Sequence, residues 1–268
     1  MCSGVVSGLV WFWLSVAAMS GGSLKEALQP SLLWMVLSQT QPGMVWLGRT
    51  GLFAVLAIVL MAARAPAGWA AISWPSLAGA MLSVLLTGSL AWLGHAGATE
   101  GPQAWGQLCG DVLHLVAAGI WPAGLAPFAL FLRCMLRTRP LELAGLPAAC
   151  VATRRFSALS FYTVGALTLS GAVNGWYLVG SFHALVETAY GRLLLLKLGF
   201  FGVMIAVAAA NLLLLKPKVM PASAPFSDDR QLAALARIER NVLIEIVVGT
   251  LVLLVVGWLG VTAPAIHT

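Results

Sequence analysis

Residues that can bind a metal ion lie on two consecutive predicted helices, toward the same side of the membrane. About twenty residues, the length that crosses the hydrocarbon, separate Trp74 from His95 and His114 from Arg133. Asp111 comes three residues before His114, so both lie on one helix face. The carboxylate can orient the imidazole and leave its other nitrogen for a metal, or it can bind the metal itself. We therefore predict a metal site at His95, Asp111 and His114, against the alternative of a hydrated polar helix end.

Three further residues are candidate metal ligands on the same side of the membrane. His183 lies in a predicted loop, His267 lies in the C-terminal tail, and Met44 begins an apolar segment. Sulfur ligands suit Cu(I), whereas imidazole and carboxylate also fit zinc, nickel or iron. These residues predict a transition-metal site and leave the identity of the metal open.

Polar and ionisable residues also occur inside or next to the apolar segments, where they are costly and mark functional sites. We assign them to a transport path or to polar structural contacts; they are Arg49, Trp121, Asn174, Tyr190, Lys197 and Glu245. Lys197 lies near a segment end, where its ammonium can reach the membrane interface. Asn174 lies between Gly171 and Gly175, a glycine spacing that permits close helix packing. Pro122 predicts a kink in its helix.

The composition predicts an all-α integral membrane protein. Hydrophobic residues make up 60% of the 268 positions and charged residues 9%, against about 25% charged residues in soluble domains. Seven stretches are long and apolar enough, or nearly so, to cross a bilayer as helices. They are Met1–Ser20, Met44–Ala63, Trp74–His95, Gln107–Leu132, Phe156–Leu178, Arg192–Leu215 and Asn241–Thr262. Residues 1–268 are thus expected to form a single transmembrane domain.

Positive charges predict the orientation of this bundle. The loops Arg133–Arg155 and Lys216–Arg240 carry five basic residues each and are expected in the cytoplasm. The N-terminus should then be cytoplasmic and the C-terminus periplasmic. Residues 216–240 are expected to form a cytoplasmic linker with a short amphipathic helix from Gln231. Pro30–Gln41 is too short to span and is expected to form an interfacial helix outside the membrane.

Several function classes are disfavoured by what the sequence lacks. The net charge of +6 is confined to a few loops and does not indicate nucleic-acid binding. The four cysteines show no CxxC spacing, and no nucleotide-binding loop occurs, which argues against an ATP-driven pump. The protein is not expected to be an enzyme.

A series of motifs follows in a fixed order along the chain. They are Gly94-His95-Ala96, Asp111-x-x-His114-Leu115, Trp121-Pro-Ala-Gly124-Leu125, Arg155-Phe156-Ser157, Ser170-Gly171, Thr188-Ala-Tyr190-Gly191-Arg192, Lys197, Asn211, Arg240 and Glu245. In order and spacing they resemble the CopD family of bacterial inner-membrane copper-resistance proteins. The usual Trp-x-Gly-Gly-Leu of that family stands here as Trp121-Pro-Ala-Gly124-Leu125. Longer members carry further helices ahead of the position of Met1.

The resemblance implies copper transport or delivery across the bacterial inner membrane. Copper, as Cu(I) or Cu(II), would be captured at the periplasmic face by His95 and His114, with Asp111 in support. It also implies a periplasmic copper-binding partner of the CopC type. Two alternatives stay open: a haem-binding electron-transfer protein that uses the same histidines as axial ligands, and a copper-assembly factor that does not transport.

Overall fold

The computed structural model describes residues 2–62, 73–94, 101, 104–137, 145–219 and 228–265. Every secondary-structure element among them is helical. Contacts between Cα atoms divide the chain into two compact units, unit 1 from Met1 to Leu108 and unit 2 from Cys109 to Thr268. The predicted ligands Asp111 and His114 both belong to unit 2.

The described part of unit 1 consists of helices and short 3-10 turns. They are α1 (Cys2–Ser20), the 3-10 turn η1 (Glu26–Leu28), α2 (Pro30–Gln39), α3 (Gln41–Ala62), α4 (Trp74–Gly88) and the 3-10 turn η2 (Ser89–Leu93). Pro30 starts α2, because its ring already holds a helical φ and its missing N–H would be unpaired there anyway. Phe12, Val16 and Val36 build a small core. The Phe12 ring stacks on Trp46 with 4.8 Å between the ring centroids.

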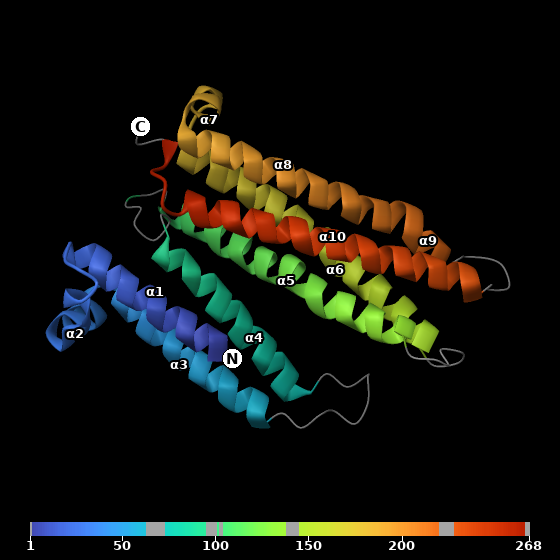
Figure 1. The fold of residues 1–268 in the computed structure, drawn as a ribbon, viewed down its shortest axis with the longest axis horizontal. Coiled ribbons are helices and arrows are strands. Elements are labelled where there is room, and N and C mark those ends of the chain that lie inside the picture. Colours follow the sequence, from blue (N-terminus) through green and yellow to red (C-terminus); the bar gives the residue numbers. More distant parts are fainter. Residues whose placement is uncertain are drawn as a thin grey trace. The chain divides into compact units, whose positions relative to one another are not determined.

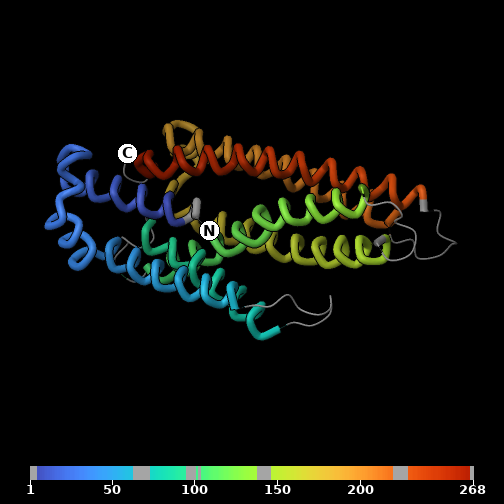
Figure 2. Tube along the Cα trace, turned by 60° about the horizontal axis from the view of Figure 1, so that its bottom comes forward, coloured from blue at the N-terminus to red at the C-terminus, as the bar shows by residue number. Residues whose placement is uncertain are grey.

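Unit 2 is built, in the part that the structure describes, on four long helices that lie side by side (Figures 1 and 2). They are α5 (Ala104–Arg137, whose first residues belong to unit 1), α6 (Gly145–Val179), α8 (Ala189–Ala210) and α10 (Asp228–Leu259). Shorter elements join them: α7 (Phe182–Glu187), the π-helical turn η4 (Asn211–Leu215) and α9 (Lys216–Val219). Trp121, Leu125 and Leu132 of α5 are almost fully buried, as are Leu235 and Val242 of α10. These side chains belong to one hydrophobic core.

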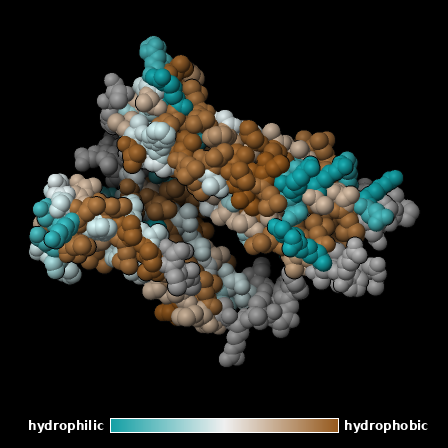
Figure 3. Space-filling view, in the orientation of Figure 1, coloured by the Kyte–Doolittle hydropathy of each residue, from teal (hydrophilic) through white to brown (hydrophobic). Residues whose placement is uncertain are grey.

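The prediction of an all-α membrane protein is confirmed. Among the described residues, six helices are long and apolar enough to cross a bilayer, and the shorter apolar stretch Val5–Ser20 belongs to α1. Large apolar side chains such as Leu213, Val247 and Leu253 are exposed on the long helices of unit 2. Figure 3 shows hydrophobic surface along these helices and hydrophilic residues toward their ends. Such an apolar belt fits a surface that faces lipid.

The helices extend beyond the apolar stretches that predict them. α6 begins at Gly145 rather than Phe156. α10 begins at Asp228, so the second half of the predicted linker Lys216–Arg240 forms the first turns of a long helix. Backbone hydrogen bonding continues past the hydrocarbon, whereas the apolar pattern ends with it. A helix also forms at Pro30–Gln39, and its interfacial position stays a prediction.

Candidate functional site

α5 and α6 approach each other closely at positions occupied by glycine. A Cβ atom added at Gly110 of α5 would lie 3.0 Å from Asn174 Oδ1, and one at Gly124 would lie 3.1 Å from Phe156 Cε2. On α6, a Cβ atom added at Gly171 would lie 3.4 Å from His114 Cε1. Glycine thus lets polar side chains of each helix reach the backbone of the other.

His114 makes its hydrogen bond to α6 and keeps one ring nitrogen free. His114 Nδ1 lies 3.1 Å from Ser170 Oγ, and Ser170 donates its own hydroxyl proton to the Ala166 carbonyl at 2.6 Å. A hydroxyl has one proton, so with the Ser170 proton on the Ala166 carbonyl, Ser170 Oγ is an acceptor for His114 Nδ1, and the Leu167 carbonyl is a further backbone acceptor for the ring. This arrangement favours the neutral tautomer with its proton on Nδ1, in which the Nε2 lone pair is available to a metal.

Asp111, about one turn before His114, contacts the next polar residue of α6. Asn174 donates from Nδ2 to Asp111 Oδ1 at 3.2 Å. A carboxylate only accepts, so the amide nitrogen faces Asp111 and the amide oxygen faces the other way. Asn174 Oδ1 is buried near Gly110 and has no hydrogen-bond partner among the described residues. The sequence predicts that Asp111 either orients the imidazole or binds the metal itself. Because Ser170 contacts the imidazole at Nδ1, direct binding of a cation is the role of Asp111 to test.

We call Asp111, His114, Ser170 and Asn174 the α5–α6 cluster. Lys197 of α8 acts electrostatically on both Asp111 and His114, and Tyr190 is within electrostatic range of Asp111. The cluster therefore combines one carboxylate, one ammonium nearby and one imidazole nitrogen with a free lone pair. In the part of the chain that the structure describes, no three His, Cys, Asp or Glu residues could hold a metal together. A metal at His114 would need a further ligand from elsewhere.

The other predicted ligands are not members of this cluster. His95 and His267 lie outside the described residues. His183 is exposed on α7, where its Nε2 atom lies 2.8 Å from Glu187 Oε2. Met44 is 61% exposed on α3 of unit 1. Their roles as ligands stay predictions.

Arg49 is tied to the end of α4 within unit 1. Its Nη1 atom donates to the Leu86 carbonyl and, at 2.6 Å, to Ser89 Oγ. These acceptors lie where α4 gives way to the 3-10 turn η2, a place where backbone carbonyls lose their helical partners. These contacts favour a structural role for Arg49 over a role in a transport path.

Trp121 and Tyr190 also have the surroundings of structural residues. Trp121 is 1% exposed, and its ring meets Phe201 edge-on with 6.1 Å between centroids. Pro122 lies within α5, which continues through it. Tyr190 is buried in the first turn of α8, whose N-terminus is capped by the side chain of Thr188.

A second set of polar contacts joins α10 to the end of α8. Asn211 donates from Nδ2 to Glu245 Oε1 at 3.0 Å, and its own Oδ1 accepts from Asn241 Nδ2 at 2.8 Å. Glu245 is 2% exposed. Asn211 begins η4, a π-helical insertion of the kind that often marks functional sites. We call Asn211, Asn241 and Glu245 the α8–α10 cluster.

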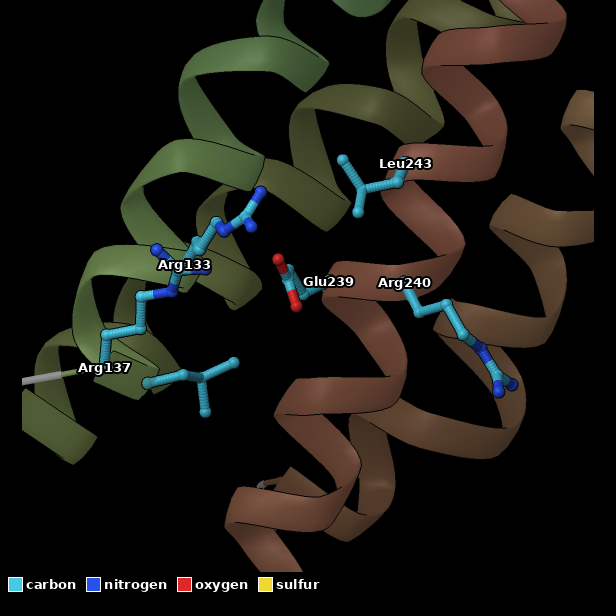
Figure 4. A pocket seen from close by; sticks show the side chains of 6 residues that line it. Arg133, Arg137, Glu239, Arg240 and Leu243 are labelled. Atoms are coloured by element: carbon cyan, nitrogen blue, oxygen red, sulfur yellow. The ribbon is translucent and has the colours of Figure 1, made fainter.

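A hollow of about 340 Å³ opens between α5 and α10. It is lined by Arg133, Leu136, Arg137, Glu239, Arg240 and Leu243. Figure 4 shows Glu239 projecting from α10 into the space between the two helices, with Arg133 and Arg137 on the α5 side. Asn241 follows the lining residue Arg240 in the sequence, and its own side chain bonds Asn211 rather than lining the hollow.

Ser170 and Asn211 belong to the motifs that carry the family resemblance, but the sequence predicts no site role for them or for Asn241. A signal for Ser170 exists in the spacing: Ser170 and Asn174 are four residues apart, and Asp111 and His114 are three apart, so each pair lies on one helix face. On antiparallel helices the first residue of one pair meets the second of the other, as Asp111 meets Asn174 here. No comparable pairing of motifs points to Asn211, whose partner is set by helix register.

Comparison with known proteins gives a separate match for each unit. Residues 1–105 match the family model described as copper resistance protein D-like, N-terminal domain, and residues 151–259 match that of copper resistance protein D, CopD. The chain is 33% identical over 267 residues to copper resistance protein D of Pseudomonas syringae pv. tomato, across 97% of this chain and 81% of that protein. The chain belongs to the CopD family. The resemblance inferred from the motifs is therefore confirmed.

Two further relatives extend the comparison for this CopD-family protein. Copper transport protein CutJ of Bacillus subtilis (strain 168) is 32% identical over 202 residues, which are 75% of this chain and 36% of CutJ. Inner membrane protein YebZ of Escherichia coli (strain K12) is 30% identical over 220 residues, 78% of this chain and 69% of YebZ. No solved structure matches the chain. The CopD match includes Ser170 and Asn174 of the α5–α6 cluster and the whole α8–α10 cluster.

Proposed function

We propose that this protein transports copper across the bacterial inner membrane, taking up the ion through His114 with Asp111 in support. The observation that carries the proposal is the free Nε2 lone pair of His114, fixed by the bond from Nδ1 to Ser170. Neutral imidazole is a common ligand for copper. The names of two relatives, copper resistance protein D and copper transport protein CutJ, support copper as the cargo.

A second ligand is needed for stable binding, and the sequence supplies a candidate. His95 is separated from His114 by a short connection, and we propose it as the second imidazole. Asp111 already accepts from Asn174 and would add an oxygen donor. Cargo would come from a periplasmic copper-binding partner of the CopC type.

The proposed orientation puts the α5–α6 cluster toward the periplasm. Basic residues mark the other end of unit 2, where α5 ends and α6 and α10 begin; they include Arg133, Arg137, Arg154, Arg155 and Arg240. Figure 1 shows these helix ends on one side of unit 2 and α7 on the other. Basic segments stay in the cytoplasm during membrane insertion.

Purified protein in liposomes tests the proposal. We expect stoichiometric copper, no Soret band in the absorption spectrum, and copper uptake that liposomes without protein lack. A Soret band would replace the proposal with the haem-binding alternative. Copper binding without any uptake would replace it with the assembly-factor alternative.

A further inference from the structure

Glu245 is an acid buried in a long apolar helix, and the copper site does not use it. The side chain is 2% exposed on α10, three residues after the core residue Val242. An ionised carboxylate in such surroundings costs several kcal/mol unless a cation pairs with it. In the described part of the chain, no lysine or arginine forms an ion pair with Glu245 within 4.0 Å.

The hydrogen bonds around Glu245 suit an acid that gains and loses a proton. Asn211 donates to Oε1, while none of the described residues bonds Oε2. Oε1 can accept this bond in either protonation state, and Oε2 is free to carry the proton. An amide cannot neutralise the carboxylate, so a proton is the simplest way to remove its charge.

The rest of the α8–α10 cluster leads from Glu245 toward the basic end of unit 2. Asn241 lies one turn before Glu245, about 6 Å along the helix axis, and bonds Asn211 at 2.8 Å. The ionisable residues that line the hollow are Arg133 and Arg137 on α5 and Glu239 and Arg240 on α10. Arg240 comes five residues before Glu245, so the hollow and Glu245 are separated by about 7.5 Å along the axis of α10.

The π-helical turn η4 gives this region a backbone that can rearrange. The Lys216 N–H bonds the Asn211 carbonyl five residues earlier, which is the π pattern. A single π turn inside an α-helix can relax to the α pattern by shifting one residue, and such turns are common at functional sites. That shift would rotate the Asn211 side chain relative to α10 and change the donor that Glu245 meets.

From these observations, we infer that Glu245 is a proton-binding site that couples proton movement to copper transport. The coupling to copper transport rests on the proposed function, whereas the proton site at Glu245 does not depend on it. In the step, the carboxylate takes one H⁺ to become the acid, and it returns that H⁺ to water at the basic end of unit 2. No other group changes its covalent or redox state.

The variant Glu245→Gln tests this inference, with the exposed Glu187→Gln of α7 as the matched control. Glutamine keeps the shape and the oxygen that accepts from Asn211, but it cannot release a proton. Infrared spectra of the copper-free protein in lipid should show a protonated-carboxyl band that disappears as pH is raised in the wild type and in Glu187→Gln. The band should be missing in Glu245→Gln. A band that persists unchanged at alkaline pH, or that survives in Glu245→Gln, would overturn the proton site.

Copper uptake into proteoliposomes under an imposed pH gradient tests the coupling. We expect the gradient to change the uptake rate severalfold for the wild type and Glu187→Gln, and to have no effect on Glu245→Gln. Equal dependence in Glu245→Gln, or dependence on a sodium gradient instead, would overturn the coupling. If Glu245→Gln does not fold, Glu245→Asp keeps an acid at a shorter reach and should retain the carboxyl band and a reduced gradient effect; loss of the band there would count against the inference. A wild type that moves no copper would refute the proposed function, while the infrared result still decides the proton site.

Discussion

The two polar clusters of unit 2 place hydrogen-bonding groups between apolar helices but leave different atoms available. In the α5–α6 cluster, each of these bonds joins one residue of α5 to one of α6, and the atoms left without a bond among the described residues include the basic nitrogen His114 Nε2 and the amide oxygen Asn174 Oδ1. In the α8–α10 cluster, two amides lead to one carboxyl group, and the free atom is Glu245 Oε2. In our proposals, the first cluster gives an electron pair to a cation, and the second gives a carboxylate to a proton. Asparagine contacts the acidic residue in both clusters.

Removal of the His114 imidazole should have the largest effect on copper affinity. A smaller effect would contradict the assignment of copper binding to the α5–α6 cluster. We expect His114→Ala to weaken copper binding by more than about 100-fold, because loss of a ligand should exceed the cost of losing its supporting partner. His183→Ala is the control, since His183 is exposed and pairs with Glu187. Competition with a chromophoric copper chelator measures both affinities. Equal affinity in wild type and His114→Ala would remove His114 from the site.

Removal of the Ser170 hydroxyl should have the next largest effect on copper binding. Ser170→Ala deletes the acceptor that holds the His114 proton on Nδ1, and we expect about 10- to 100-fold weaker binding. Thr168→Ala is the matched control, because the Thr168 hydroxyl bonds only the Val164 carbonyl of its own helix. If both variants bind copper alike, the tautomer of His114 is not set by Ser170.

The α8–α10 cluster should respond in stability rather than in copper affinity. Asn211→Leu removes the donor to Glu245 and the acceptor of Asn241, and we expect a loss of about 1–3 kcal/mol of unfolding free energy. Asn241→Leu removes only the outer bond and should cost less. Unfolding in mixed micelles, followed by circular dichroism, measures both. A copper affinity that falls in Asn211→Leu as much as in Ser170→Ala would show that the clusters are not separate.

The smallest predicted effect is a difference in unfolding free energy between alanine variants of two glycines, one on α5 and one on α6. A Cβ atom at Gly110 would lie 3.0 Å from Asn174 Oδ1, so the amide must move, whereas one at Gly171 meets His114 Cε1 at an ordinary 3.4 Å. We expect Gly110→Ala to cost about 1 kcal/mol of unfolding free energy through overpacking. Gly171→Ala should stay within about 0.5 kcal/mol of the wild type. Equal costs, measured by the same unfolding assay, would show that α5 and α6 adjust freely.

The sequence predicts the membrane helices well because lipid forces each apolar stretch into a continuous helix. It misplaces their ends, as at Gly145 of α6, because the apolar pattern ends where the hydrocarbon ends and the helix does not. Asp111 and His114 are found from local spacing, which a helix converts directly into a shared face. Ser170 lies 56 residues from His114, and only the register of α5 against α6 brings them together. Local patterns do not encode that register.

The contact between His114 and Ser170 makes helix register and cation affinity thermodynamically linked. An ion at Nε2 requires the proton to be on Nδ1, and that is the tautomer that Ser170 accepts from. The free energy that the contact adds to ion binding must equal the free energy that the ion adds to the contact. A slide of α6 along α5 would carry Ser170 away and remove the acceptor that stabilises the proton on Nδ1. Sliding would therefore act as a release mechanism, because it lowers the affinity for the ion without moving any residue that touches it.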